Sequence, residues 1–91
     1  MSSINIVHPT TLEMAQARAA VDQVAARLTQ EYGLACQWQD DELRFERPGV
    51  TGSIRLMPQQ VHFSAELGFP FSAMQNMVEA GVRKALAEKL G

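Results

Sequence analysis

The spacing of the apolar residues changes once along this chain, and this change constrains the fold more than any other feature. Up to Gly33 the apolar residues recur every three or four positions, which is typical of one face of a helix. Beyond Gly33 they recur at every second position, as in half-buried strands. Gly33 itself stands where a left-handed helix cap is expected. The helical positions are Met14, Ala17, Val21, Val24, Leu28 and Tyr32.

Four short alternating segments follow Gly33, separated by the turn sequences Asp40-Asp41, Pro48-Gly49 and Pro58-Gln59. Such short connections predict an antiparallel meander with one apolar face and one polar, solvent-exposed face. The predicted inward residues are Leu34, Cys36, Trp38, Leu43, Phe45, Gly52, Ile54, Leu56, Val61, Phe63, Ala65 and Leu67. The predicted outward residues are Gln37, Gln39, Arg44, Glu46, Thr51, Ser53, Arg55, His62, Ser64 and Glu66, a polar set that we interpret as solvated.

The two ends of the chain complete the predicted order β-α-β-β-β-β-α. Residues 4–7 form a short strand stopped by Pro9, and its partner strand stays open. Capping boxes are expected at Thr10 with Glu13 and at Ser72 with Gln75, the second opening a helix whose apolar face includes Met74 and Met77. We therefore predict one α+β domain over residues 1–91. It is a two-layer sandwich, an antiparallel sheet with two amphipathic helices on one face.

Composition excludes several classes of protein. The net charge is −2, and eight basic residues are scattered among ten acidic ones, which argues against nucleic-acid binding. A single cysteine permits no internal disulfide. No apolar run approaches the roughly 20 residues of a transmembrane helix, and the N-terminus lacks the pattern of a signal peptide. The expected location is cytoplasmic.

The polar residues form no recognisable catalytic, cofactor-binding or metal-binding constellation. The two histidines, His8 and His62, lack further ligands of the right type and count, so we interpret both as surface residues. Cys36, on the apolar face of its strand, is expected to be buried and inert. The acidic cluster at residues 40–42 is expected to form an exposed turn. Gly52, an inward residue, indicates a bulge or the close approach of a helix.

The segment Phe69-Pro70-Phe71 is the one candidate contact site. If Ser72 caps the second helix, the usual staple partner of Phe71 would be Asn76, which is polar. The candidate apolar contact patch is therefore Phe69, Phe71 and Met74, exposed for a partner. The alternative, which we favour from the sequence, is that both phenylalanines plug the end of the core.

The sequence resembles a family of small bacterial proteins, the polyhydroxyalkanoic acid system proteins, almost from end to end. The similarity is carried by residues 15–18, 28–34, the strand around Trp38, residues 67–68 and the closing helix. Its most specific part is the stretch from Phe45 to Gly52, with Glu46, Arg47, Gly49 and Val50 between them. The resemblance implies a cytoplasmic protein of polyester storage and carries over no catalytic residue.

Three functional hypotheses follow from this resemblance. The first is a non-enzymatic accessory protein, contacting a polyester granule or a granule protein through the apolar patch. The second is a small carrier that holds an acyl ligand between the helices and the sheet, which would require a cavity. The third, an enzyme, has the least support in the residue inventory. Homodimer formation through the open sheet face or an edge strand is compatible with each.

Overall fold

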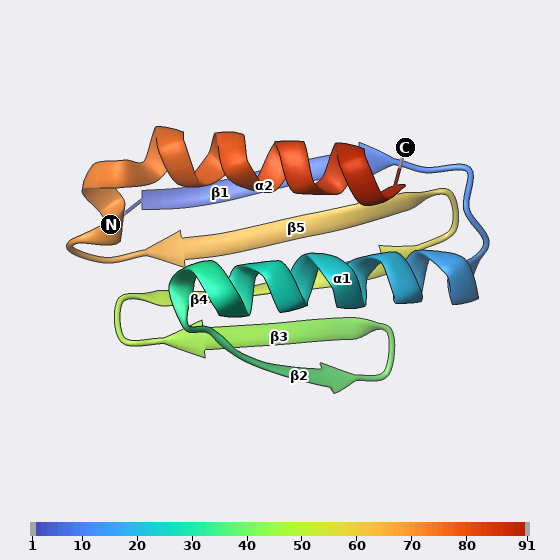
Figure 1. The fold of residues 1–91 in the computed structure, drawn as a ribbon, viewed down its shortest axis with the longest axis horizontal. Coiled ribbons are helices and arrows are strands. Elements are labelled where there is room, and N and C mark those ends of the chain that lie inside the picture. Colours follow the sequence, from blue (N-terminus) through green and yellow to red (C-terminus); the bar gives the residue numbers. More distant parts are fainter. Residues whose placement is uncertain (1, 91) are drawn as a thin grey trace.

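The computed structural model describes residues 2–90 and confirms the α+β order β-α-β-β-β-β-α (Figure 1). Two-residue turns join the last four strands, as the sequence predicts. The sheet is antiparallel throughout, with strand order β1-β5-β4-β3-β2. Its elements are β1 (Ser2–Pro9), α1 (Met14–Tyr32), β2 (Ala35–Gln39), β3 (Glu42–Arg47), β4 (Val50–Met57), β5 (Gln60–Leu67), the 3₁₀ turn η1 (Phe71–Met74) and α2 (Gln75–Leu90).

The partner of the first strand, left open by the sequence, is β5. Ile4 pairs with Ala65 and Ile6 with Phe63, so the longer β1 extends the sheet beyond the meander. Helix α1 then carries the chain across the sheet to β2 at the opposite edge (Figure 1). The two strands on either side of α1 in the chain, β1 and β2, thus form the two edges of the sheet.

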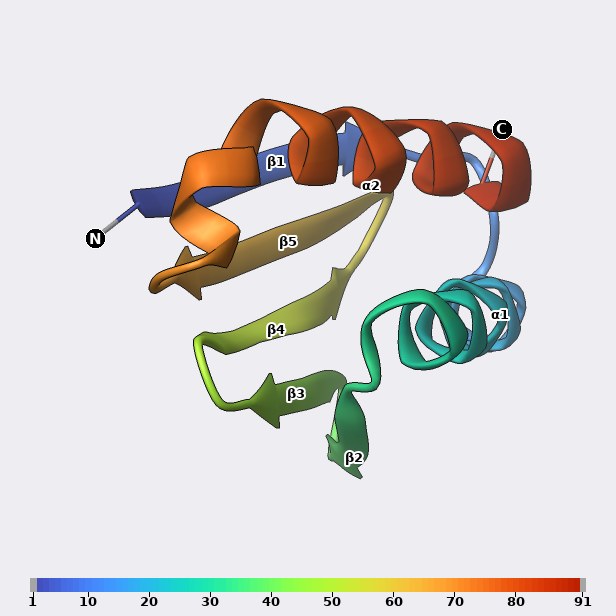
Figure 2. The same ribbon diagram turned by 60° about the vertical axis from the view of Figure 1, so that its left-hand side comes forward.

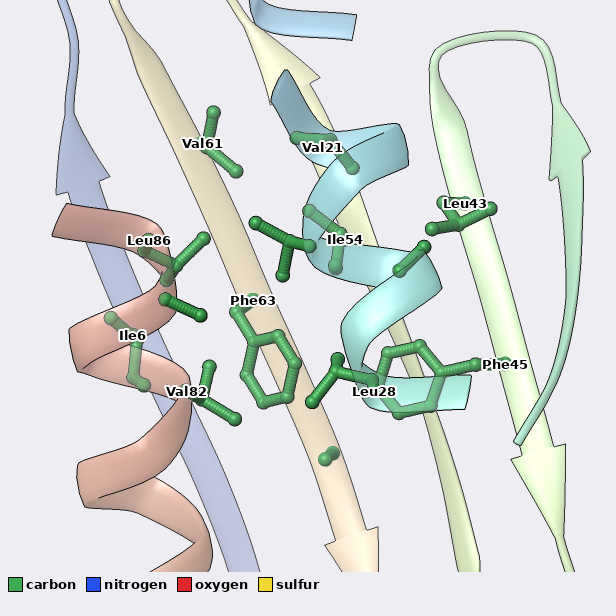
Figure 3. Packing of buried hydrophobic residues seen from close by; sticks show 14 of the residues in the cluster. Ile6, Val21, Leu28, Leu43, Phe45, Ile54, Val61, Phe63, Val82 and Leu86 are labelled. Atoms are coloured by element: carbon green, nitrogen blue, oxygen red, sulfur yellow. The ribbon is translucent and has the colours of Figure 1, made fainter. Parts of the chain in front are cut away.

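Both helices cover the same face of the sheet, which leaves the other face open (Figure 2). Helix α1 packs over β4, and α2 runs along β1 with its flank against α1. The core fills the space between the layers, with Val21 and Leu28 from α1 meeting Ile54 and Phe63 of the sheet (Figure 3). The buried residues of α2 are Val78, Val82, Ala85, Leu86 and Leu90.

The start of the first helix differs from the prediction. The N-cap of α1 is Glu13, paired in a capping box with Gln16, and not Thr10. Thr10 is buried, and its hydroxyl accepts from the backbone N–H of Leu12 and donates to the carbonyl of Leu90 at 3.3 Å. The Thr10 hydroxyl is thus bonded to a residue 80 positions away in sequence and does not cap α1. The other end follows the prediction, because Gly33 is a left-handed cap with φ 67°.

The predicted capping box at Ser72 is also wrong. The turn η1 precedes α2, and its N-cap, Pro70, makes no side-chain capping bond. The backbone N–H of Ser72 donates to the carbonyl of Gly68 at 3.0 Å, and the side-chain amide of Gln75 reaches away from the helix to the carbonyl of Ser3. The end of β5 thus passes into α2 through backbone hydrogen bonds.

Gly52 allows close approach of an aromatic ring, and the strand pairing is regular there, without a bulge. A Cβ at this position would lie 2.6 Å from Cζ of Phe45 and 2.4 Å from the carbonyl oxygen of Ser64. The ring of Phe45 therefore lies across the sheet surface, stacked on Phe63 with centroids 5.5 Å apart. The close neighbours are the ring of Phe45 in β3 and the backbone of β5, and not a helix.

Candidate apolar contact site

The candidate patch lies in the segment between β5 and α2, at one end of the molecule (Figure 1, orange). Phe69 stands in the loop, and 86% of its surface is exposed. Met74, in η1, is 38% exposed. A large aromatic side chain left almost wholly in water is uncommon and marks a surface where an apolar partner would be stabilised.

Phe71 differs from Phe69 and is half-buried against the core. Its ring lies over Gly49, where an added Cβ would come within 3.3 Å of it, and under the guanidinium of Arg47 at 4.9 Å from the ring centroid. The two phenylalanines therefore have different roles. Phe71 closes the end of the core, as the alternative hypothesis expected for both phenylalanines, whereas Phe69 is exposed, so that hypothesis is wrong for Phe69.

Met77 adds a second strongly exposed side chain that sequence reasoning placed on the inward face of the helix. It is 70% exposed, because the buried face of α2 is set by Val78 and Val82 and Met77 is rotated about 100° from Val78. The inward positions after Val78 recur at four, seven and eight residues, and this spacing could have excluded Met77. We call Phe69, Met74 and Met77 the exposed patch.

The exposed patch lies in a neutral stretch of chain. From residue 67 to residue 78 there is no charged side chain, and the polar residues there are Ser72, Gln75 and Asn76. Residues 72–77 line a shallow surface hollow. Hydroxyl and amide groups beside methionine thioethers form a surface that is apolar, adaptable and uncharged.

Between the helices and the sheet, the interior holds a cavity of about 20 Å³ at the end closed by Phe71. It is lined by apolar side chains and Tyr32. This volume is roughly that of one water molecule, whereas pockets for drug-sized ligands measure roughly 300–1,000 Å³. Burial raises the pKa of the Tyr32 hydroxyl at the edge of this cavity. An acyl ligand would therefore have to open the core.

The two histidines lie on opposite faces of the sheet. His8 is on the helix side and its strand partner is Val61, whereas His62 faces outward opposite Arg55. Nε2 of His8 is buried without a hydrogen-bond partner in residues 2–90. Within the same range, no three of the histidine, cysteine and carboxylate side chains come together as a metal-binding group.

Cys36 corrects the expectation of a buried cysteine. It is on the helix side of β2, as the alternation predicts, but it is exposed because α1 packs over β4 and reaches the edge strand only with side chains. Its Sγ lies 3.4 Å from the hydroxyl oxygen of Thr29. The thiol is thus a surface group at the sheet edge.

The acidic turn is exposed, as predicted, and its charges have basic partners. Asp41 lies 3.6 Å from Arg18, and Glu42 lies 2.9 Å from Arg44. The guanidinium of Arg18 also stacks on the ring of Trp38, whose Nε1 donates to Asp22 at 2.6 Å. These contacts tie β2 to α1 and hold the turn in place.

The outward face of the sheet carries the polar residues predicted for it. Gln37, Arg44, Ser53 and Ser64 lie side by side across four strands. The face is hollowed over β2, β3 and β4 into an open, mainly polar depression. No Phe, Tyr or Trp side chain projects from the outward positions of these strands, so the face lacks the usual stacking surface of an RNA-binding sheet.

The fold and the exposed patch define a class: a small two-layer α+β protein with an uncharged apolar segment at one end. A family model described as "Putative polyhydroxyalkanoic acid system protein" matches residues 4–90, and the chain belongs to this family. A search of curated proteins finds no match. No helix within residues 2–90 is long and apolar enough to cross a membrane.

Proposed function

We propose that this chain is a non-enzymatic accessory protein of polyhydroxyalkanoate storage. It contacts the polyester granule, or a protein on the granule, through the exposed patch of Phe69, Met74 and Met77. The expected site of action is the cytoplasm, at the storage granules. Family membership supports the link to polyhydroxyalkanoate, and the exposure of Phe69 is the observation that carries the proposed contact.

The chemistry of the exposed patch suits a neutral aliphatic polyester. Such a polymer offers alkyl groups and ester carbonyl oxygens, and no charge. Phe69 and Met77 supply apolar area, while Ser72 and Asn76 can donate to carbonyl oxygens. Interfacial helices that bind anionic membranes carry Lys and Arg on their polar face, and the stretch from residue 67 to 78 has neither.

An acyl-carrier function is the alternative, and the 20 Å³ cavity favours it less because the core would need to expand. The accessory proposal instead uses a surface that is already exposed. It requires no rearrangement of Phe71, which packs against Gly49 at the end of the core.

Co-sedimentation with washed polyester granules tests the proposal, with anionic liposomes and serum albumin as controls. The variant is the double substitution Phe69→Ser and Met77→Gln, which removes exposed apolar groups without touching the core. The matched control is Val7→Thr, because Val7 is 57% exposed but lies on β1, outside the patch. We expect saturable granule binding that the double variant weakens and the control keeps.

A second arm uses granules stripped of protein, which separates polymer contact from contact with a granule protein. Equal binding to both preparations indicates the polymer as the partner. Absence of binding to intact granules would contradict the proposed function.

A further inference from the structure

Among residues 2–90 the sheet has two edge strands, β1 and β2, and they differ in how they are protected. An edge strand presents unpaired N–H and C=O groups that can pair with another strand. Natural proteins block such edges with covering helices, prolines, charged side chains or bulges. The comparison of the two edges shows which one is open to a partner.

The β1 edge is blocked in three ways. The side-chain amide of Gln75 donates to the carbonyl of Ser3 at 3.1 Å, and Pro9 has no N–H to offer. Helix α2 lies along β1 (Figures 1 and 2). Two copies paired through β1 would bring their α2 axes within about 5 Å, one strand spacing, whereas packed helices need roughly 8–10 Å.

The β2 edge is less protected, although Arg18 of α1 donates to the carbonyl of Asp40 in the turn beyond the strand. Residues 35–39 contain no proline and no charged side chain, and they pair with β3 without a bulge. Helix α1 lies over β4 and reaches β2 through side chains, with Thr29 at Cys36 and Arg18 and Asp22 at Trp38. Two copies paired through β2 would hold their α1 helices over β4, five strand spacings or about 24 Å apart, so the helices do not collide.

The ladder pattern identifies the free backbone groups of β2. The N–H of Leu56 donates to the carbonyl of Asp41, so odd-numbered residues of β3 bond to β4 and even-numbered ones bond to β2. In β2, the odd-numbered residues therefore pair with β3. The N–H and C=O groups of Cys36 and Trp38 point away from the sheet.

We propose that β2 is a self-association edge, on which two copies of this chain pair antiparallel about a two-fold axis at Gln37. Cys36 of each copy then lies opposite Trp38 of the other, and their four N–H and four C=O groups form four hydrogen bonds. The result is one continuous ten-stranded sheet. This interface is independent of the exposed patch and of the proposed function.

The charges near β2 suit a second copy better than an arbitrary strand. In this register the Asp40-Asp41 turn of one copy approaches the Gly33-Leu34 end of the other. The guanidinium of Arg47 lies beside Gly33, where it donates to the carbonyl of Tyr32 and stacks on Phe71, and Arg47 makes no ion pair within residues 2–90. Each end of the pairing therefore brings the acidic turn of one copy, in which Asp41 is already paired with Arg18, toward Arg47 of the other copy. Because a single short strand is buried, we expect a weak, concentration-dependent dimer.

Register-specific cross-linking tests the proposal, with Cys36→Ser as the background. In the proposed register Gln37 faces its own copy as a non-hydrogen-bonded pair, with Cα atoms about 4.5 Å apart, which a disulfide can span. Gln39→Cys is the matched control, because two such residues would lie about 13 Å apart. We expect mild oxidation to cross-link Gln37→Cys many-fold faster than Gln39→Cys. Equal rates, or no cross-linked dimer, would overturn the register.

Sedimentation equilibrium supplies an independent measurement. Cys36→Pro removes one outward N–H in each copy, hence two of the four hydrogen bonds, and proline is tolerated at a solvent-facing edge position. We expect dimerisation at least roughly tenfold weaker than in Cys36→Ser. A wild-type chain that is monomeric at all concentrations would refute self-association. If the wild-type chain were monomeric and Cys36→Pro no longer bound granules, self-association would be wrong. The β2 edge would then pair with a partner other than a second copy.

Discussion

Gly52 gives the sharpest test of the packing described above, because the space around it is fixed by neighbouring backbone. In Gly52→Ala, the new Cβ would lie 2.4 Å from the carbonyl oxygen of Ser64 and 2.9 Å from Cα of Ala65, both in the paired strand. It would also meet Cζ of Phe45 at 2.6 Å, and that ring is held in the core by its stacking on Phe63. None of these atoms can move without disturbing the ladder or the core.

The size of the effect follows from two opposing contributions. Overpacking of a core costs roughly 1–3 kcal/mol, and replacing glycine within a strand by alanine returns roughly 0.5–1 kcal/mol of backbone entropy. With backbone atoms this close we take the upper part of the range, which gives a net loss of about 2 kcal/mol. For a domain of this size, that corresponds to a fall in Tm of roughly 8–16 °C.

Urea unfolding measures the change in stability, read from the midpoint at constant m-value. The matched control is Gly81→Ala in α2, where the added Cβ meets only the Tyr32 hydroxyl at an ordinary 3.7 Å. The control should stabilise by roughly 0.5–1 kcal/mol, because alanine is the better helix former. Equal or greater stability of Gly52→Ala would refute the packing argument at this site.

Two further predictions concern exposure. Phe71→Ser should lower the free energy of unfolding by roughly 1–3 kcal/mol, since its half-buried ring closes the core, whereas Phe69→Ser should change it by less than about 0.5 kcal/mol. Similar losses in both variants, measured by urea unfolding, would contradict the separate roles of the two rings. The Cys36 thiol should react with a disulfide reagent in the folded protein, at a rate close to that in denaturant. A thiol that reacts only after unfolding would show that β2 is covered.

Much of the fold was predictable because local signals agree. Strict alternation and two-residue turns define the meander, and Gly33 marks the end of the helix. The register follows, because a shift by one residue would turn Ile54 and Phe63 to the open face. The family was recognisable for a related reason, since the turn between Phe45 and Gly52 has a distinctive sequence.

The helix starts were not predictable from local sequence. The pattern indicated Thr10 as the cap of α1, whereas the Thr10 hydroxyl bonds the carbonyl of Leu90 and Glu13 is the cap. At α2, Ser72 lies within the inserted turn η1 and not at the start of the α-helix. These outcomes depend on tertiary contacts that no window of sequence contains.

The solvent exposure of residues at the edges of the sheet could not be predicted from the sequence either. Five strands span about 19 Å between the outer axes, so two helices cannot cover every inward position. Cys36 lies on the inward side and is still exposed. In the same way, the sequence did not show which of Phe69 and Phe71 would be buried. In the structure the ring of Phe71 packs on Gly49, whereas Phe69 is exposed.

Binding isotherms on protein-free polyester particles test the central proposal most directly, with wild type, Phe69→Ser and Val7→Thr compared under the same conditions. Burying one phenylalanine side chain contributes roughly 1.5–3 kcal/mol, so Phe69→Ser should bind about 10- to 100-fold more weakly. Val7→Thr should bind like wild type, because Val7 lies outside the exposed patch. Saturable binding with this pattern is the predicted result. Binding that is equal in all three proteins, or absent in wild type, would contradict polymer contact through Phe69.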